Sequence, residues 1–237
     1  MSILRVISCQ KGRCFMLCVD HISFSYRKKQ VLCDISFTAK EGDFIGIIGK
    51  NGCGKSTLLS VLAGVKRPAN GMLTFHETPL FSSKSVPSET VGYVPQLNPL
   101  LPELSVRDNL KLWYRTTASS SVESPEALYR QLGLTDYFHT PVAKLSEGMK
   151  KRVSIASVLQ NQPKILILDE PSAALDLPCK EIIHEQLLSF TGNGGIVIFT
   201  THEEAEFSLC TTLYILKDGI LQRADAVQDK HALIQQF

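Results

Sequence analysis

The residues with the clearest chemical pattern lie between positions 49 and 57. Gly49, Gly54, Lys55 and Ser56 fit the phosphate-loop spacing G-x-x-x-x-G-K-[ST]. An apolar run that reads as a buried strand precedes the loop, and a helix is expected to begin near Lys55. The glycines let backbone N–H groups turn inward around an anion, and the helix N-terminus adds positive potential there. We expect Lys55 to reach the β- and γ-phosphates of a nucleotide and the Ser56 hydroxyl to ligate Mg²⁺.

The expected nucleotide site takes in the whole loop: Gly49, Asn51, Gly52, Cys53, Gly54, Lys55, Ser56 and Thr57. Cys53 lies beside the lysine and the helix N-terminus, two features that lower the pKa of a thiol. We therefore expect alkylation of Cys53 to abolish hydrolysis and bound MgATP to protect it. The alternative is that Cys53 is a small filler residue shielded from reagents.

A second signal is the segment ILILDE at positions 165–170. An apolar strand that ends in an acid is typical of a fully buried parallel strand. Asp169 would then lie at the carboxyl edge of the sheet, opposite the phosphate loop, where it can hold Mg²⁺ through water. Glu170 would point a second carboxylate toward the γ-phosphate and polarise the attacking water. The alternative is that Asp-Glu-Pro only begins a turn.

The elements that must position these residues follow from the hydrophobic pattern. Residues 16–38 read as strands with a polar hairpin turn at 27–30, and residues 71–75 and 90–94 read as two more strands. Serine-rich loops are expected at 82–88 and 116–124. Helices are expected to start at Ser105, Ser124 and Ser146. The α/β alternation then returns, with a helix over 176–190, a strand over 196–200 and a terminal hairpin at 211–222.

Composition limits the function classes. The formal net charge of +2 is too small to indicate a nucleic-acid partner. Apolar runs stay short of the roughly 18 residues that span a bilayer, so a membrane role would come through a partner. Seven cysteines, an odd number, favour reduced thiols in the cytosol over a disulfide framework. Residues 1–15 show no periodicity and are expected to be a dispensable tail, or to reflect an upstream start, before one domain over 16–237.

Further motifs follow in an order that resembles the ATP-binding cassette (ABC) ATPase family, over about residues 16–222. By this resemblance, Tyr26 matches the aromatic that stacks on adenine. Gln96, in YVPQ, matches the glutamine that touches Mg²⁺ and couples to a membrane partner. Residues 172–176 match the D-loop, and His202 matches the switch histidine.

The LSEGM segment at 145–149 is similar to the family signature LSGGQ. The resemblance implies that Ser146 and Gly148 bind the γ-phosphate of ATP held by the other subunit, so hydrolysis needs a dimer. Glu147 replaces the first glycine and Met149 replaces the glutamine. Glu147 brings a negative charge toward a polyphosphate unless its side chain points away, which bears on the strength of the ATP-locked dimer.

The resemblance implies an α/β fold: a P-loop NTPase (RecA-like) core sheet, an N-terminal antiparallel β subdomain and a small α-helical subdomain at about 98–161. It implies catalytic roles for Lys55, Glu170 and His202, and Mg²⁺ ligands at Ser56, Gln96 and Asp169. The function expected is that of an ATP-hydrolysing subunit at the cytoplasmic face of a membrane. It would form a homodimer or heterodimer and drive a separate transmembrane permease, in the direction of export. The alternatives are a soluble ABC ATPase acting on ribosomes or DNA, and a cassette that binds ATP without hydrolysis.

Overall fold

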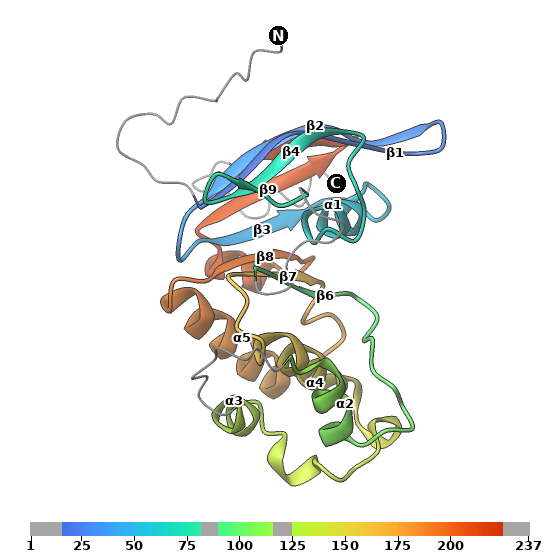
Figure 1. Cartoon of the computed structure of the whole chain (residues 1–237), viewed down its shortest axis with the longest axis vertical. Coiled ribbons are helices and arrows are strands. Elements are labelled where there is room, and N and C mark those ends of the chain that lie inside the picture. The colour runs from blue at the N-terminus through green and yellow to red at the C-terminus, as the bar shows by residue number, and fades with distance from the viewer. Residues whose placement is uncertain (1–15, 82–89, 116–124, 225–237) are drawn as a thin grey trace.

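The computed structural model describes residues 16–81, 90–115 and 125–224. In Figure 1 a curved antiparallel sheet lies above a second sheet, and a group of helices lies below both. The fold is therefore mixed α/β, with one antiparallel and one largely parallel sheet, as the sequence predicts. The sequence interpretations that concern residues 1–15, 82–88 and 116–124 lie outside the described residues.

The antiparallel sheet has the order β2-β1-β4-β5. Its strands are β1 (Leu17–Tyr26), β2 (Lys29–Ala39), β4 (Asn70–Phe75) and β5 (Thr78–Pro79). The predicted β1–β2 hairpin is confirmed, but its turn is shorter than 27–30 because Lys29 and Gln30 already pair with Tyr26 and Ser25. Arg27 has a positive φ of 53°, which reverses the chain within two residues.

The second sheet has the order β10-β9-β3-β8-β7-β6. Its strands are β3 (Phe44–Ile48), β6 (Val91–Val94), β7 (Ile165–Asp169), β8 (Ile196–Thr200), β9 (Thr212–Lys217) and β10 (Ile220–Arg223). All neighbours run parallel except β9 and β10, which form the predicted terminal hairpin. The hairpin joins this sheet because β9 pairs with β3.

Both faces of the parallel sheet are buried, which explains its continuous apolar strands. On β7, Ile165 and Ile167 face one core with α1 (Lys55–Leu62) and the antiparallel sheet. Leu166 and Leu168 face the other core, which contains α5 (Leu177–Gly192). The sheet is thus fixed from both sides, and its strand ends form a rigid base for a site.

The helical region contains α2 (Val106–Trp113), α3 (Glu126–Gln131), α4 (Glu147–Leu159) and the 3₁₀ turns η1 (Thr135–Tyr137) and η2 (Val142–Lys144). The helix starts predicted at Ser105 and Ser146 are confirmed by their caps: Ser105 accepts from the N–H of Asp108, and Ser146 from that of Met149. Asp176 caps α5 in the same way. In the described part of the chain no helix is both long and apolar enough to cross a membrane.

Candidate functional site

Four loops that carry sequence-predicted site residues leave the same edge of the parallel sheet. The phosphate loop follows β3, Gln96 follows β6, Glu170 follows β7, and His202 follows β8. Because these strands run parallel, their carboxyl ends meet at one edge, where open α/β sheets bind their ligands. The topology therefore gathers residues that are up to about 150 positions apart in sequence.

The phosphate loop requires glycine at two positions for different reasons. A Cβ at Gly49 would lie 2.4 Å from the carbonyl oxygen of Leu216. Gly54 has a φ of +114°, in the region that favours glycine. Lys55 is buried, and its ammonium donates to the carbonyl oxygens of Gly49 at 2.8 Å and Lys50 at 3.2 Å. The loop thus encloses a positive charge at the N-terminus of α1, which suits a phosphate group.

Thr200 organises the end of β7. It pairs with Asp169 across the β7–β8 ladder, and its hydroxyl donates to Asp169 Oδ1 at 2.7 Å. The same hydroxyl oxygen accepts from the backbone N–H of Glu170 at 3.0 Å. Asp169 and Thr200 are both buried. One side chain therefore holds the carboxylate of Asp169 and the backbone of Glu170.

Glu170 contacts two other predicted site residues, one with each carboxylate oxygen. Its Oε1 lies 3.0 Å from His202 Nε2, and its Oε2 accepts from Gln96 Nε2 at 3.0 Å. Its backbone has a positive φ of 47°, which is uncommon for a residue with a side chain and is found at functional sites. The loops after β6, β7 and β8 thus converge on one carboxylate.

Tyr26 lies beside the start of α1. Its hydroxyl is 3.5 Å from Thr57 Oγ1, and the Lys66 ammonium lies 5.3 Å from its ring centroid. Tyr26 is 46% exposed, so part of its side chain is accessible to a ligand beside the phosphate loop. The structure thus brings Tyr26 next to the loop, as the family resemblance implies.

The signature residues lie at the N-terminus of α4. Glu147 pairs with Lys150 at 2.7 Å, so its carboxylate is partly neutralised within its own helix. A Cβ on Gly148 would lie 2.7 Å from the Cys179 sulfur, so this glycine also permits close packing of α4 against α5. Within the described ranges, no hydrogen bond or ion pair joins Ser146 or Gly148 to the phosphate loop of the same chain.

Comparison with known proteins decides the family. The ABC transporter family model matches residues 32–173, which include the phosphate loop, Gln96, the signature and Asp169-Glu170. The chain belongs to the ABC transporter family. Its similarity to Nod factor export ATP-binding protein I of Rhizobium etli is 35% identity over 95% of this chain and 72% of that protein. The linearmycin resistance ATP-binding protein LnrL of Bacillus subtilis is 32% identical over 86% of this chain and 67% of that protein.

Solved structures support the same assignment. A dimeric bacterial ABC transporter cassette superposes with a TM-score of 0.79 and 25% identity, covering 90% of this chain and 100% of that chain. cbiO1 from Clostridium perfringens, described as part of the ABC transporter complex cbiONQ, has a TM-score of 0.75 and 28% identity, covering 94% of this chain and 92% of that chain. The protein is an ATP-binding subunit of the ABC transporter type and an ATPase.

The prediction of a reactive Cys53 rested on a lowered thiol pKa, and that premise is wrong. Burial raises the pKa of the Cys53 thiol above its ordinary value, and this outweighs the lowering effect of the Lys55 charge and of backbone hydrogen bonds. The side chain packs against the core that α1 shares with the antiparallel sheet. Cys53 is therefore closer to the shielded filler residue that was the alternative.

Two residues that sequence reasoning missed support the ABC ATPase site. Thr200 is the first, and its position two residues before His202 was the available signal. Lys151, on α4, is the second: it is buried, and its ammonium donates to the carbonyl oxygens of Gln96 at 3.0 Å and Pro95 at 3.3 Å. Burial lowers the pKa of Lys151, while Asp169, Glu147 and Glu170 oppose that effect. The lysine therefore ties the signature helix to the Gln96 loop.

The donor atoms at the site fit Mg²⁺. Ser56 is exposed in the first turn of α1, and Asp169 and Gln96 add a carboxylate and an amide. Hard oxygen ligands of this kind suit Mg²⁺, which is bound in such sites by one or two protein groups together with phosphates and water. Among the described residues, His, Cys, Asp and Glu form no group of three or more that could hold a metal.

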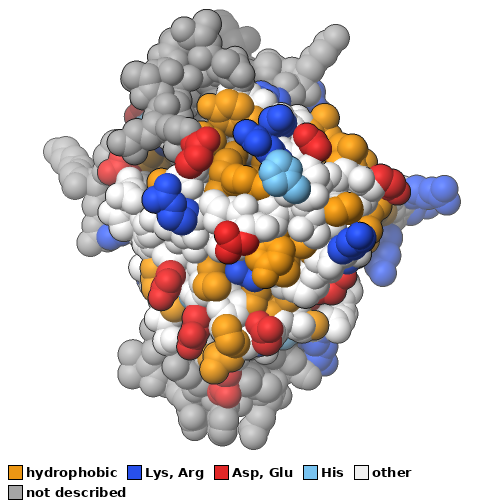
Figure 2. Space-filling model, turned by 90° about the horizontal axis from the view of Figure 1, so that it is seen from below, with side chains coloured by type: hydrophobic (Ala, Val, Ile, Leu, Met, Phe, Trp, Pro, Cys, Tyr) orange, Lys and Arg blue, Asp and Glu red, His pale blue; other side chains and the backbone are white. Residues whose placement is uncertain are grey.

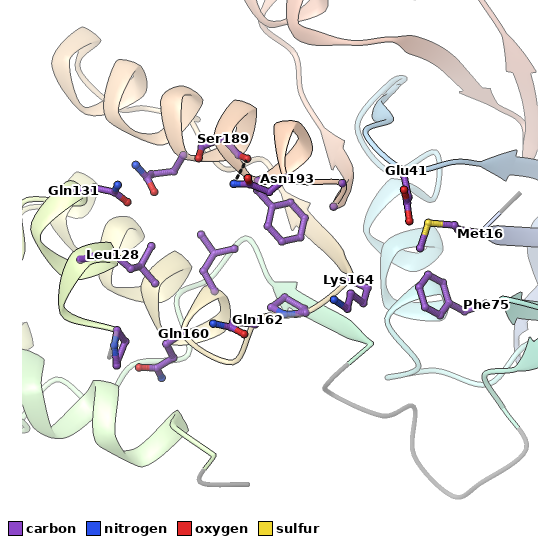
Figure 3. Close-up of a pocket in the computed structure, with 18 of the residues that line it drawn as sticks. Met16, Glu41, Phe75, Leu128, Gln131, Gln160, Gln162, Lys164, Ser189 and Asn193 are labelled. Atoms are coloured by element: carbon purple, nitrogen blue, oxygen red, sulfur yellow. Dashed lines mark hydrogen bonds between the residues drawn. The ribbon is translucent and has the colours of Figure 1, made fainter. Parts of the chain in front are cut away.

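A groove of about 680 Å³ lies away from these loops (Figure 3). Glu41, Lys164, Ser189 and Asn193 are among its lining residues. Lys164 directly precedes β7, so the groove lies at the amino end of the parallel strands. Nucleotides bind at the carboxyl ends in such sheets, and the groove is therefore separate from the ATP site.

Proposed function

We propose that this chain hydrolyses MgATP to power export through a separate membrane protein. The observation that carries the proposal is the position of Glu170, which contacts Gln96 and His202 beside the phosphate loop. A carboxylate in this position can orient water for attack on a γ-phosphate. The names of two relatives, which describe Nod factor export and linearmycin resistance, support the direction of transport.

Each residue has a separate part in the proposed reaction. Lys55 and the loop amides hold the phosphates, and Ser56, Asp169 and Gln96 would hold Mg²⁺, which neutralises charge on the β- and γ-phosphates when bound. Glu170 accepts a hydrogen bond from the attacking water and takes up its proton. His202 holds Glu170 from one side and, as a donor at the γ-phosphate, stabilises the charge that develops there.

We further propose that two cassettes, alike or different, close head to tail around ATP. Ser146 and Gly148 of one subunit would then complete the site of the other. The capped N-terminus of α4 supports this proposal because helix N-termini attract phosphate. The pairing of Glu147 with Lys150 reduces the repulsion that an acid in the signature would otherwise cause.

The membrane partner is proposed to bind near the Gln96 loop, with this subunit at the cytoplasmic face of the membrane. Leu97, directly after Gln96, is 85% exposed, and Leu101 and Leu112 are also exposed. Figure 2, viewed from the helical end, shows hydrophobic side chains interspersed with acidic and basic ones. Exposed apolar groups rimmed by polar groups are typical of protein contact surfaces.

Replacement of Glu170 by glutamine tests the proposal. The amide keeps the shape of the side chain but cannot accept the proton, so we expect a ~10²–10⁴-fold slower hydrolysis. MgATP binding, measured by calorimetry, should change little, and size-exclusion chromatography should show an ATP-dependent dimer. Glu185→Gln, an exposed change on α5, is the control. Hydrolysis by Glu170→Gln at the wild-type rate would show that Glu170 is not the base.

A further inference from the structure

A second buried carboxylate lies behind the site and has no part in the reaction proposed above. Glu206 belongs to η3 (Glu204–Leu209), the 3₁₀ turn that follows His202, and its side chain is only 2% exposed. A buried ionised carboxylate is costly unless several donors compensate it. The contacts of the Glu206 carboxylate therefore indicate its role.

The Glu206 carboxylate is connected to its surroundings through His184. His184 Nε2, from α5, lies 2.7 Å from Oε1, and because an ionised carboxylate can only accept, this nitrogen carries the proton. Ser172 Oγ lies 3.3 Å from the same His184 nitrogen, so Glu206, His184 and Ser172 form a chain of polar contacts. Burial alone would raise the pKa of Glu206, but the hydrogen bond and charge of His184, together with the nearby hydroxyls of Ser172 and Thr201, bring the pKa below its ordinary value.

Ser172 and Thr201, which lie near Glu206, belong to the two catalytic loops. Ser172 is two residues after Glu170, and Thr201 directly precedes His202. Both side chains are buried. Glu206, in the segment after His202, is thus linked through His184 to Ser172 in the loop after β7, just beyond the point where Thr200 joins the strands themselves.

We propose that Glu206 and His184 are positioning residues, which hold Glu170 and His202 at the separation that hydrolysis needs. The inference rests on the proposed roles of those two residues. The 3.0 Å contact between Glu170 and His202 depends on the relative placement of their loops, and the Glu206–His184–Ser172 contacts connect the segment after His202 to the loop that carries Glu170. Loss of the carboxylate leaves buried donors without a partner, so the loops can separate.

A second ion pair in the same region makes the test practicable. Lys180, on α5, pairs with Glu203 at 2.6 Å, and this pair is more exposed than His184–Glu206. It connects α5 to the segment after His202 independently of Glu206. We therefore expect Glu206 variants to keep the fold while the catalytic loops lose their alignment.

The experiment measures single-turnover ATP hydrolysis and MgATP affinity of the whole chain. We expect Glu206→Ala to slow hydrolysis ~10–100-fold, because small misplacements of catalytic groups have effects of that size, with affinity within about 3-fold of wild type. Glu206→Gln, which still accepts hydrogen bonds, should recover most of the rate. Glu185→Ala, on the exposed side of α5, is the matched control and should match wild type.

The Glu206→Ala substitution made in a His202→Ala variant separates a positioning role from simple stabilisation. In a His202→Ala chain, Glu206→Ala should lower the melting temperature as before but slow hydrolysis little further, because the loop it aligns has lost its catalytic group. Equal slowing in both backgrounds, or an unchanged rate in the single variant, would overturn the inference. If Glu206→Ala does not fold, His184→Ala carries the same test. Hydrolysis by Glu170→Gln at the wild-type rate would instead count against the proposed function.

Discussion

Replacement of Thr200 by valine separates the structural link at the end of β7 from the chemistry of the acids. Valine has nearly the same shape but no hydroxyl. The change therefore removes the donor to Asp169 Oδ1 and the acceptor for the N–H of Glu170. Because Thr200 is fully buried, water cannot easily replace either bond.

The size of the effect follows from these two losses. A buried polar group left without its partner costs about 1–3 kcal/mol, and more when it is charged. The added methyl group recovers about 0.8 kcal/mol by burial. We therefore expect Thr200→Val to lower the free energy of unfolding by about 2–5 kcal/mol, and the melting temperature by about 5–15 °C for a chain of this length.

The matched control is Thr191→Val on α5. Thr191 is also buried, but its hydroxyl bonds only to carbonyl oxygens of the preceding helical turn, Leu187 and Leu188. Those carbonyls have partners within the helix, so the loss should be below about 1 kcal/mol. Thermal unfolding of both variants and of Thr200→Ser, which keeps the hydroxyl, gives the comparison.

The same variant also tests the site. An outer-sphere partner of a metal ligand is worth about 10–100-fold in metal affinity, so MgATP should bind to Thr200→Val at least ~10-fold more weakly. ATP in the presence of EDTA should bind as it does to the wild type. A Thr200→Val chain that melts like Thr191→Val and binds MgATP normally would refute the argument that Thr200 orients the acids.

Three further outcomes are expected. Lys151→Met should slow hydrolysis about 10-fold, because it releases the Gln96 loop. The control is Lys164→Met, an exposed change at the far end of β7, which should leave the rate unchanged. Steady-state ATPase assays compare the two variants. Iodoacetamide at pH 8 should label Cys53 more slowly in the folded chain than in urea, because burial raises the pKa of the thiol. Peptide mass spectrometry measures the two labelling rates, and equal rates would contradict this reasoning. The lowered pKa of Glu206 gives stability that is complete above about pH 4.3 and lost as pH falls through the folded value. The melting-temperature gap between the wild type and Glu206→Gln should therefore be present at neutral pH and close in strong acid.

Features that depend on neighbouring residues could be predicted from the sequence. The strand, loop and helix around Lys55 appear where expected, because apolar runs, glycine spacing and helix starts are local signals. The caps at Ser105, Ser146 and Asp176 are local in the same sense, since each side chain bonds to an N–H three residues later.

Features that depend on strand order could not be predicted. Gln96 meets Glu170 across 74 positions only because β6 pairs with β7, and Thr200 meets Asp169 only in the observed β7–β8 register. Cys53 shows the converse. A local rule indicated a lowered pKa, but burial against distant core residues decided the outcome.

The position of β6 has a consequence for the dynamics of the site. Among the described strands of the parallel sheet, β6 stands at the edge and pairs with β7 alone, whereas β7 and β8 are flanked on both sides. Local opening costs less where fewer bonds must break, so backbone amides in β6 should exchange with deuterium faster than those in β7 and β8. The Gln96 loop is then the component that should leave and rejoin Glu170 most readily, and the two hydrogen bonds from Lys151 oppose that movement.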